Sequence, residues 1–149
     1  MRFESWVSES FESWVSGSLT RILDAVVIVL RDGARVLAVR RAAGVARPHH
    51  WSLPTGRVEP GETHARTVER EAREELGLDV RAVACVWECA TDDASFELHW
   101  WSAAIVGGAL APDPAEVAEA RWVTVEEYLG LTPGFPVHRE FFEKVWPTL

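Results

Sequence analysis

Three glutamates are spaced so that a helix would place their carboxylates on one face. Glu71, Glu74 and Glu75 are related by steps of three and four residues, which are neighbouring positions on a helix surface. Like charges at this spacing cost about 0.2–0.5 kcal/mol per pair in an isolated helix, so a merely solvated helix would gain by alternating its charges. Hard cations such as Mg²⁺ take oxygen ligands and keep positions open for water and substrate phosphates. The spacing therefore predicts a divalent-cation site.

A helix that positions these carboxylates is predicted from Thr63 to Gly77. Thr63 suits the N-cap, Leu76 ends the helix, and Gly77 suits the C′ position that follows it. One side of the helix forms an apolar stripe made of Ala65, Val68, Ala72 and Leu76. Glu75 lies closest to this stripe on a helical wheel. We therefore expect the acidic cluster at the margin between core and solvent.

The residues before the helix add fixed glycines and a charged pair to the pattern. Gly61 and Gly56 let the preceding loop turn tightly and approach a metal closely. With its gaps, the stretch is Gly56-x5-Glu62-x7-Arg70-Glu71-Ala72-x-Glu74-Glu75-x-Gly77-Leu78. This pattern resembles the Nudix box of the MutT/Nudix hydrolases at every charged and glycine position. Ala72 is a small member of the usual aliphatic set, and Thr55 stands where many members carry a second glycine.

The resemblance implies a role for each residue of the box. Metal ions, Mg²⁺ or Mn²⁺, would be bound by the Gly56 carbonyl, Glu71, Glu74 and Glu75. Glu62 and Arg70 resemble the family's structural pair, which orients loop and helix. Such a site suits the cleavage of a pyrophosphate bond, since bound metal neutralises phosphate charge and lowers the pKa of water.

The general base is left open between several carboxylates. It is a member of the acidic cluster or a glutamate from a later loop, where Glu116 and Glu119 are the candidates. We prefer Glu116, which would also be a further metal ligand.

Substrate contacts are expected near the box. Arg40 and Arg41 end a predicted strand and could reach phosphates, with ordinary surface charge as the alternative. Trp51 could stack on a base, although core packing fits it equally well. Trp100 and Trp101 are neighbours on a strand, so their side chains should point to opposite faces.

Other potential ligands have no partner that the sequence reveals. His49, His50 and His99 are expected to be loop or surface residues. Cys85 and Cys89 are expected to lie on one face of a strand as small core residues, and they complete no four-ligand zinc set.

The order of predicted elements matches the family's fold. Strands are expected near residues 22–30, 35–40, 51–53, 80–89, 96–106 and 120–123, and further helices near 124–129 and 138–145. The resemblance covers roughly residues 25–149 and implies an α/β fold, a mixed β-sheet sandwiched between helices (α/β/α). One domain, residues 19–149, is consistent with the length of 149 residues.

The first eighteen residues contain a tandem octapeptide, FESWVSES followed by FESWVSGS. Its periodicity favours an amphipathic helix, while its composition suits a pair of short strands. Because exposed tryptophans favour association, we expect segment 1–18 to pack on the domain or on a second subunit. In the second case the protein would be a homodimer.

Charge and hydropathy limit the function classes. The net charge of −8 argues against binding a nucleic-acid polymer. No apolar run is long enough to span a membrane, and the N-terminus lacks a signal-peptide pattern, so we expect a cytoplasmic location.

The expected substrate is a small nucleotide, a nucleoside diphosphate derivative. Within the family, ADP-ribose enzymes often carry a proline soon after the box and diadenosine polyphosphate enzymes a tyrosine, whereas here Pro112 and Tyr128 come much later. This favours MutT-like hydrolysis of nucleoside triphosphates, with ADP-ribose or a sugar nucleotide as the alternative. A nucleotide-sensing module without turnover is disfavoured by the intact box glutamates, and so is a diphosphate isomerase of related fold.

Overall fold

The computed structural model describes residues 22–149, so the predicted N-terminal segment 1–18 lies outside the described residues. The elements are β1 (Leu23–Asp32), β2 (Arg35–Arg41), β3 (Trp51–Ser52), β4 (Thr55–Arg57), α2 (His64–Leu76), β5 (Leu78–Ala90), β6 (Phe96–Gly108), β7 (Val117–Thr124), α3 (Val125–Leu129), α4 (Pro136–Lys144) and the 3₁₀ turn η1 (Trp146–Thr148). No helix among residues 22–149 is long and apolar enough to cross a membrane.

The sheet is mixed and is organised around β1. This strand pairs parallel with β6 and antiparallel with β4 and β2, while β5 continues the sheet beyond β6. β2 in turn carries β3 and β7 as antiparallel neighbours. The apolar run of β1 is buried on both faces, as expected for a central strand.

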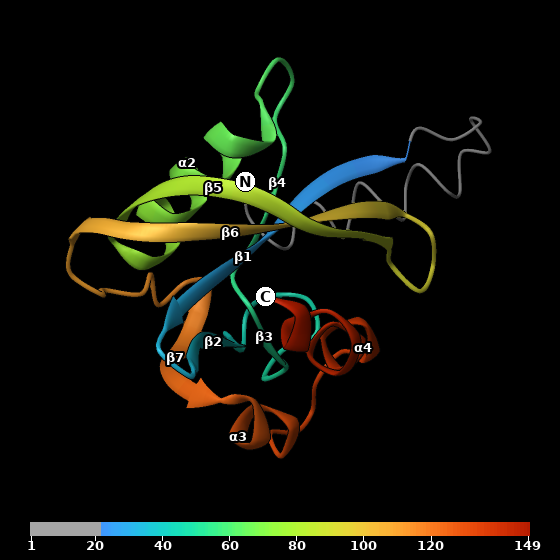
Figure 1. The fold of residues 1–149 in the computed structure, drawn as a ribbon. Coiled ribbons are helices and arrows are strands. Elements are labelled where there is room, and N and C mark those ends of the chain that lie inside the picture. Colours follow the sequence, from blue (N-terminus) through green and yellow to red (C-terminus); the bar gives the residue numbers. More distant parts are fainter. Residues whose placement is uncertain (1–21) are drawn as a thin grey trace.

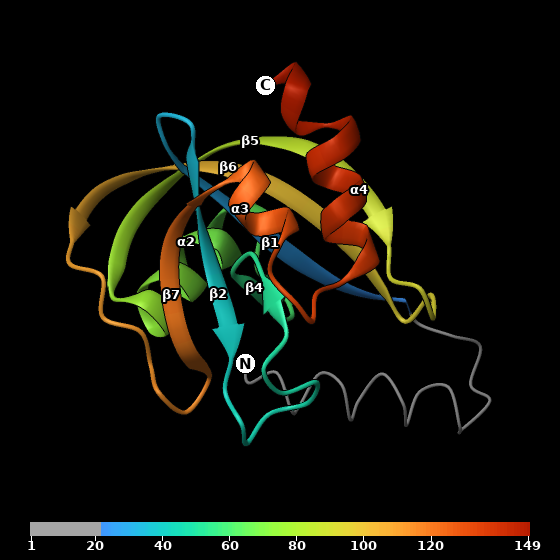
Figure 2. The ribbon, with the colours of Figure 1, turned by 90° about the horizontal axis from the view of Figure 1, so that it is seen from below.

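Helices cover both faces of the sheet (Figures 1 and 2). On one face α2 packs against alternate residues of β1, including Val26 and Ile28, through Val68, Ala72 and Leu76. On the other face Val27 and Val29 of β1 pack in a second cluster that contains aromatic residues of α4. This is the predicted α/β/α sandwich, and Trp100 and Trp101 contribute to opposite clusters as expected.

The helix caps follow the sequence prediction. The Thr63 side chain accepts a hydrogen bond from the Arg66 amide, and Gly77 ends α2 in the left-handed conformation with φ 71°. Thr124 caps α3 in a capping box with Glu127. The last helix begins earlier than predicted, because Pro136 occupies its first turn, where the missing N–H costs nothing.

The prediction for the cysteines is wrong for Cys85 and for the shared face, whereas Cys89 packs against the core cluster as expected. Cys85 is exposed and Cys89 is only half-buried. Cys85 pairs with Trp101 and Cys89 with Leu98, so one residue of β5 between them has no partner. A bulge of this kind reverses the facing of the strand beyond it. The two thiols therefore lie on opposite faces.

The prediction for one histidine is also wrong. His49 is exposed and His50 half-buried in the loop after β2, but His99 is buried on β6. Its ring lies on the face that α2 covers, because it is in register with Val26 of β1.

Candidate functional site

The carboxylates of the box differ in depth on α2. Glu71 and Glu75 are almost fully buried, at 1% and 4% exposure, whereas the Glu74 side chain is 53% exposed. The wheel prediction of a cluster at the core margin therefore holds for Glu74, and the other two lie deeper. Two carboxyls one helical turn apart inside the protein must either take up a proton or gain a compensating positive charge.

Gly56 lies directly against Glu71. β4 places this glycine by pairing it with Val26 of β1. A Cβ atom built on Gly56 would lie 2.7 Å from Glu71 Oε1, and closer still to Cγ and Cδ of the same side chain. The glycine is required because its backbone and the carboxylate occupy adjoining space.

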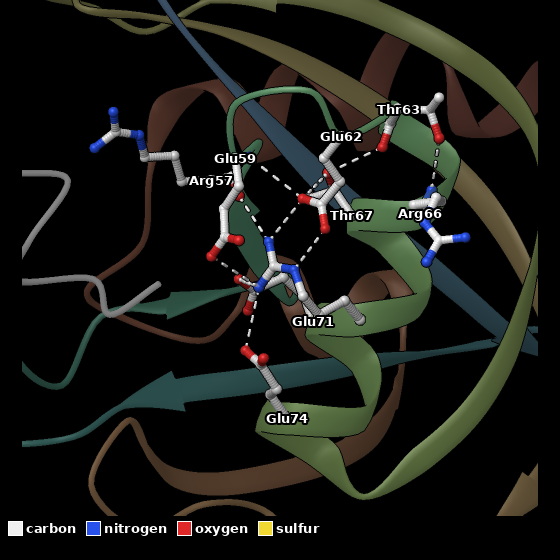
Figure 3. A network of polar contacts seen from close by, with 9 residues as sticks. Arg57, Glu59, Glu62, Thr63, Arg66, Thr67, Glu71 and Glu74 are labelled. Carbon is white, nitrogen blue, oxygen red and sulfur yellow. Dashed lines mark hydrogen bonds and ion pairs between the residues drawn. The ribbon is translucent and has the colours of Figure 1, made fainter.

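Glu62 and Arg70 form a bidentate ion pair between α2 and residues 58–63, the box loop. Figure 3 shows Glu62 and its polar neighbours in this network. Arg70 Nε donates to Glu62 Oε2 at 2.7 Å, and Nη2 donates to Oε1 at 2.9 Å. The Thr67 hydroxyl also donates to Glu62 Oε1. The hydrogen bond from Arg70, with that from Thr67, lowers the pKa of Glu62 to about 2.

Arg70 also joins the loop to the acidic face. Its Nη1 donates to Glu71 Oε1 at 2.9 Å and to Glu74 Oε2 at 3.1 Å, and Nη2 donates to the Arg57 carbonyl. The Glu62 hydrogen bond raises the pKa of Arg70, with further support from Glu71. One guanidinium thus fixes the loop, the strand β4 and two box carboxylates.

Burial and mutual repulsion raise the pKa values of the deeper carboxyls. The pKa of Glu75 lies well above its usual value because of burial and the nearby charges of Glu71 and Glu116. Burial also raises the pKa of Glu71. Glu75 Oε2 is buried with no hydrogen-bond partner among residues 22–149. A bound cation would add positive charge beside this oxygen.

The loop after β6 holds Glu116 beside Glu75. The Ala111 amide donates to the Leu76 carbonyl at 2.7 Å, and the Asp113 amide donates to the Glu75 carbonyl at 2.8 Å. These bonds satisfy carbonyls at the C-terminal end of α2. Glu116 is buried, and its amide donates to the Asp113 carbonyl.

The other candidate base is placed differently. Glu119 on β7 is partly exposed, and Arg121 donates to its Oε2 at 2.7 Å. Glu116, not Glu119, lies with the acidic cluster.

The two arginines that end β2 separate. Arg41 is buried, and its burial lowers the pKa of its guanidinium to about 10. Glu75 and Glu116 lie close enough for their charges to oppose this shift. Arg40 instead lies 3.6 Å from a Glu119 carboxylate oxygen. A change of register between them in the pairing with β7 accompanies this difference.

Trp51 is a core residue. It is buried in the cluster beneath α4, its carbonyl accepts a hydrogen bond from the Tyr128 hydroxyl, and the Arg121 guanidinium lies over its ring at 5.0 Å. Of the three expected substrate contacts, only Arg41 is brought to the acidic cluster.

Thr67 is a supporting residue that sequence reasoning missed. It is fully buried and bonds both Glu62 and the Thr63 carbonyl. Its position one turn after the N-cap and one turn before Glu71 was the signal that could have identified it.

Comparison with known proteins decides the family. Residues 21–145 match the NUDIX domain. The chain belongs to the NUDIX family. It is 33% identical to the NAD-capped RNA hydrolase NudC of Deinococcus radiodurans over 102 residues, which cover 68% of this chain and 36% of that protein. It is also 33% identical to a putative 8-oxo-dGTP diphosphatase of Bacillus subtilis over 100 residues, covering 67% and 64% respectively.

Solved structures support the Nudix fold. A NUDIX hydrolase from Nitrosomonas europaea superposes with a TM-score of 0.70 at 20% identity, covering 84% of this chain and 72% of that one. The two curated relatives are matched over about a third and two thirds of their length. Nudix hydrolases generally use divalent metals.

Proposed function

We propose that this chain is a divalent-metal-dependent hydrolase that cleaves a diphosphate linkage in a nucleotide. The observation that carries the proposal is the pair of buried carboxylates, Glu71 and Glu75, whose pKa values are raised by burial. Such groups gain most from a cation that replaces lost hydration. Bound metal, Mg²⁺ or Mn²⁺, would polarise phosphoryl oxygens and acidify a water molecule.

The ligands in this proposal are the Gly56 carbonyl, Glu71, Glu74 and Glu75, with Glu116 as a further candidate. The donor set is all oxygen, which suits Mg²⁺ better than softer ions. Gly56 fits this role because Glu71 occupies the space beside it. Arg70 would hold Glu71 and Glu74 in place through its hydrogen bonds.

Glu116 is our candidate for the general base. It is buried close enough to Glu75 for their charges to interact, and the loop bonds to α2 restrain its backbone. A base in this position would accept a proton from water held between the acidic cluster and the phosphate. Arg41 would neutralise phosphate charge from the same side.

The substrate we favour is a nucleoside triphosphate, including oxidised forms. The support is the 33% identity to a protein named as a putative 8-oxo-dGTP diphosphatase. A dinucleotide-like diphosphate, such as ADP-ribose or a sugar nucleotide, is the second candidate. The similarity to a protein named as an NAD-capped RNA hydrolase favours this second candidate. The same similarity weakens the expectation that the chain binds no nucleic-acid polymer.

The test is a substrate panel with Mg²⁺ or Mn²⁺. It contains nucleoside triphosphates, their oxidised forms, ADP-ribose, nucleotide sugars and NAD-capped RNA. We expect a nucleoside monophosphate and pyrophosphate from a triphosphate. Highest kcat/KM on ADP-ribose or a nucleotide sugar would transfer the proposal to the second candidate. Tight nucleotide binding in calorimetry without turnover of any substrate would contradict hydrolysis.

A further inference from the structure

A second cluster of potential metal ligands lies at the N-terminal end of α2, opposite the end that the loop holding Glu116 contacts. Its centre is His99 on β6, which is buried at 5% exposure. His99 Nε2 lies 2.9 Å from Asp24 Oδ1 on β1, and Nδ1 lies 2.5 Å from Glu88 Oε2 on β5. The strands that flank β6 thus place one carboxylate at each ring nitrogen.

The first residue of α2 completes the cluster. The rings of His64 and His99 lie 4.0 Å apart between centroids, at an angle of 33°. Asp24, His64 and His99 each offer one ligand atom, and these atoms lie within 4.8 Å of one another. Tetrahedral sites with bonds of 2.0–2.2 Å space their ligands by about 3.4 Å. Small side-chain rotations would close the cluster around an ion.

We propose that Asp24, His64 and His99 form a second metal site, selective for Zn²⁺ or a similar transition-metal ion. Two imidazoles and one carboxylate suit such ions, whereas Mg²⁺ prefers oxygen alone. Glu88 fits the site as the carboxylate that fixes the His99 ring from its other nitrogen, an arrangement typical of zinc-binding histidines. A water molecule would take the fourth position.

A second grouping shares His99 but fits less well. It consists of Glu88, Glu97 and His99. It offers a single imidazole where the first grouping offers two, so it would bind a transition metal more weakly. Without any metal, His99 would instead be an imidazole held between two carboxylates, and this is the alternative that the test must exclude.

The site would be separate from the box carboxylates. His64 precedes Glu71 by seven residues, which is about 10 Å along a helix. An ion at the cluster would join β1, β6 and the start of α2. The Val58 amide already donates to the Asp24 carbonyl, so the box loop would be held at the same point. Metal here would stabilise the helix that carries the box.

The experiment measures Zn²⁺ binding to the metal-stripped full chain by calorimetry in excess Mg²⁺, with Co²⁺ absorption as a reporter of tetrahedral nitrogen ligation. We expect one Zn²⁺ per chain and a higher Tm with Zn²⁺. His64→Ala and Asp24→Asn should each weaken binding at least tenfold and abolish the Tm increase. Both variants leave the buried His99 ring in place, so we expect both to fold. Circular dichroism checks this.

Two controls separate this site from others. His49→Ala removes an exposed loop histidine, and Glu75→Gln alters the acidic cluster; both should keep the high-affinity Zn²⁺ site. Equal Zn²⁺ affinity in the His64→Ala variant and the unmodified protein would overturn the proposal, as would an absence of Zn²⁺ binding. Binding lost only in Glu75→Gln would assign the ion to the acidic cluster instead.

Discussion

At the scale of single residues, close contacts decide what the box tolerates. The position of Glu71 explains why residue 56 is a glycine. The two hydrogen bonds from Arg70 explain the low pKa of Glu62. The fixed spacing of the box predicted the Glu62–Arg70 pair, which the structure shows. It did not predict that Arg41 is buried near Glu75 while Arg40 pairs with Glu119, because that depends on a local shift in strand pairing.

Gly56→Ala should disturb the acidic cluster. The new Cβ would overlap the Glu71 side chain, and overpacking of this kind costs about 1–3 kcal/mol. We expect lower stability in urea unfolding and weaker Mg²⁺ binding in calorimetry. Gly44→Ala is the matched control, since a Cβ there meets nothing within 4 Å. Equal losses in the two variants would show that the contact with Glu71 is unimportant.

Glu62→Gln should destabilise the protein most above pH 4.5. The pKa of Glu62 is lowered from 4.5 to about 2 in the folded state, so its contribution is present above pH 4.5 and is lost as pH falls towards 2. We expect a loss of about 1–3 kcal/mol at neutral pH, shrinking below pH 4.5. Urea unfolding at a series of pH values measures this loss of stability.

Glu59→Gln is the control, because the exposed Glu59 carboxylate contacts the same arginine only at 3.8 Å and should contribute less. If the stability difference between Glu62→Gln and the unmodified protein stays constant with pH, the assignment is refuted.

At the scale of elements, caps and apolar stripes were predictable and strand irregularities were not. Thr63 and Gly77 mark the ends of α2 through local chemistry that the sequence displays. The facing of Cys85 and the burial of His99 depend on bulges in β5 and on pairing between distant strands. No local pattern encodes a bulge, so alternation along the strand gave the wrong facing.

Burial of His138 on the inner side of α4 should give the protein a measurable acid sensitivity. Both ring nitrogens are buried without hydrogen-bond partners in the described chain, and burial lowers the pKa from 6.5 to about 3. Below pH 6.5 the unfolded chain binds a proton that the folded chain does not, so stability falls as pH decreases. Between pH 6.5 and 5 we expect His138 to contribute a loss of roughly 1.5–2 kcal/mol.

Replacing His138 tests this directly. In His138→Phe, chemical denaturation should show that this part of the pH dependence is gone, while the exposed-loop control His49→Ala retains it. Identical pH dependence in His138→Phe and the unmodified protein would mean that the histidine is protonated in the fold.

At the scale of the whole molecule, the layered fold can be predicted from the order of the helices and strands. The surface on which segment 1–18 packs cannot be predicted in this way. The α/β/α arrangement was predictable because one box helix and a late pair of helices must cover two faces of one sheet. Segment 1–18 lies outside the described residues. The prediction from its repeated Phe-Glu-Ser-Trp-Val sequence, that it packs on the domain or on a second subunit, stays a prediction.

Deleting residues 1–18 tests that prediction. We expect a smaller assembly in light scattering if the segment joins subunits, or a lower Tm at constant assembly size if it packs on its own domain. Unchanged assembly size together with unchanged Tm would contradict both forms of the prediction.

The central claim is that the buried carboxylates on α2 bind the catalytic metal. Glu75→Gln keeps the size of the side chain but removes its charge, and Glu119→Gln makes the same change at a partly exposed site on β7. With the best substrate and saturating Mg²⁺, we expect kcat to fall at least about 100-fold in Glu75→Gln, since loss of supporting residues alone costs 10–100-fold in metal sites. Glu119→Gln should stay near the unmodified protein. The decisive measurement is metal-dependent kcat of folded Glu75→Gln: a drop of this size supports the account, and unchanged turnover would contradict it.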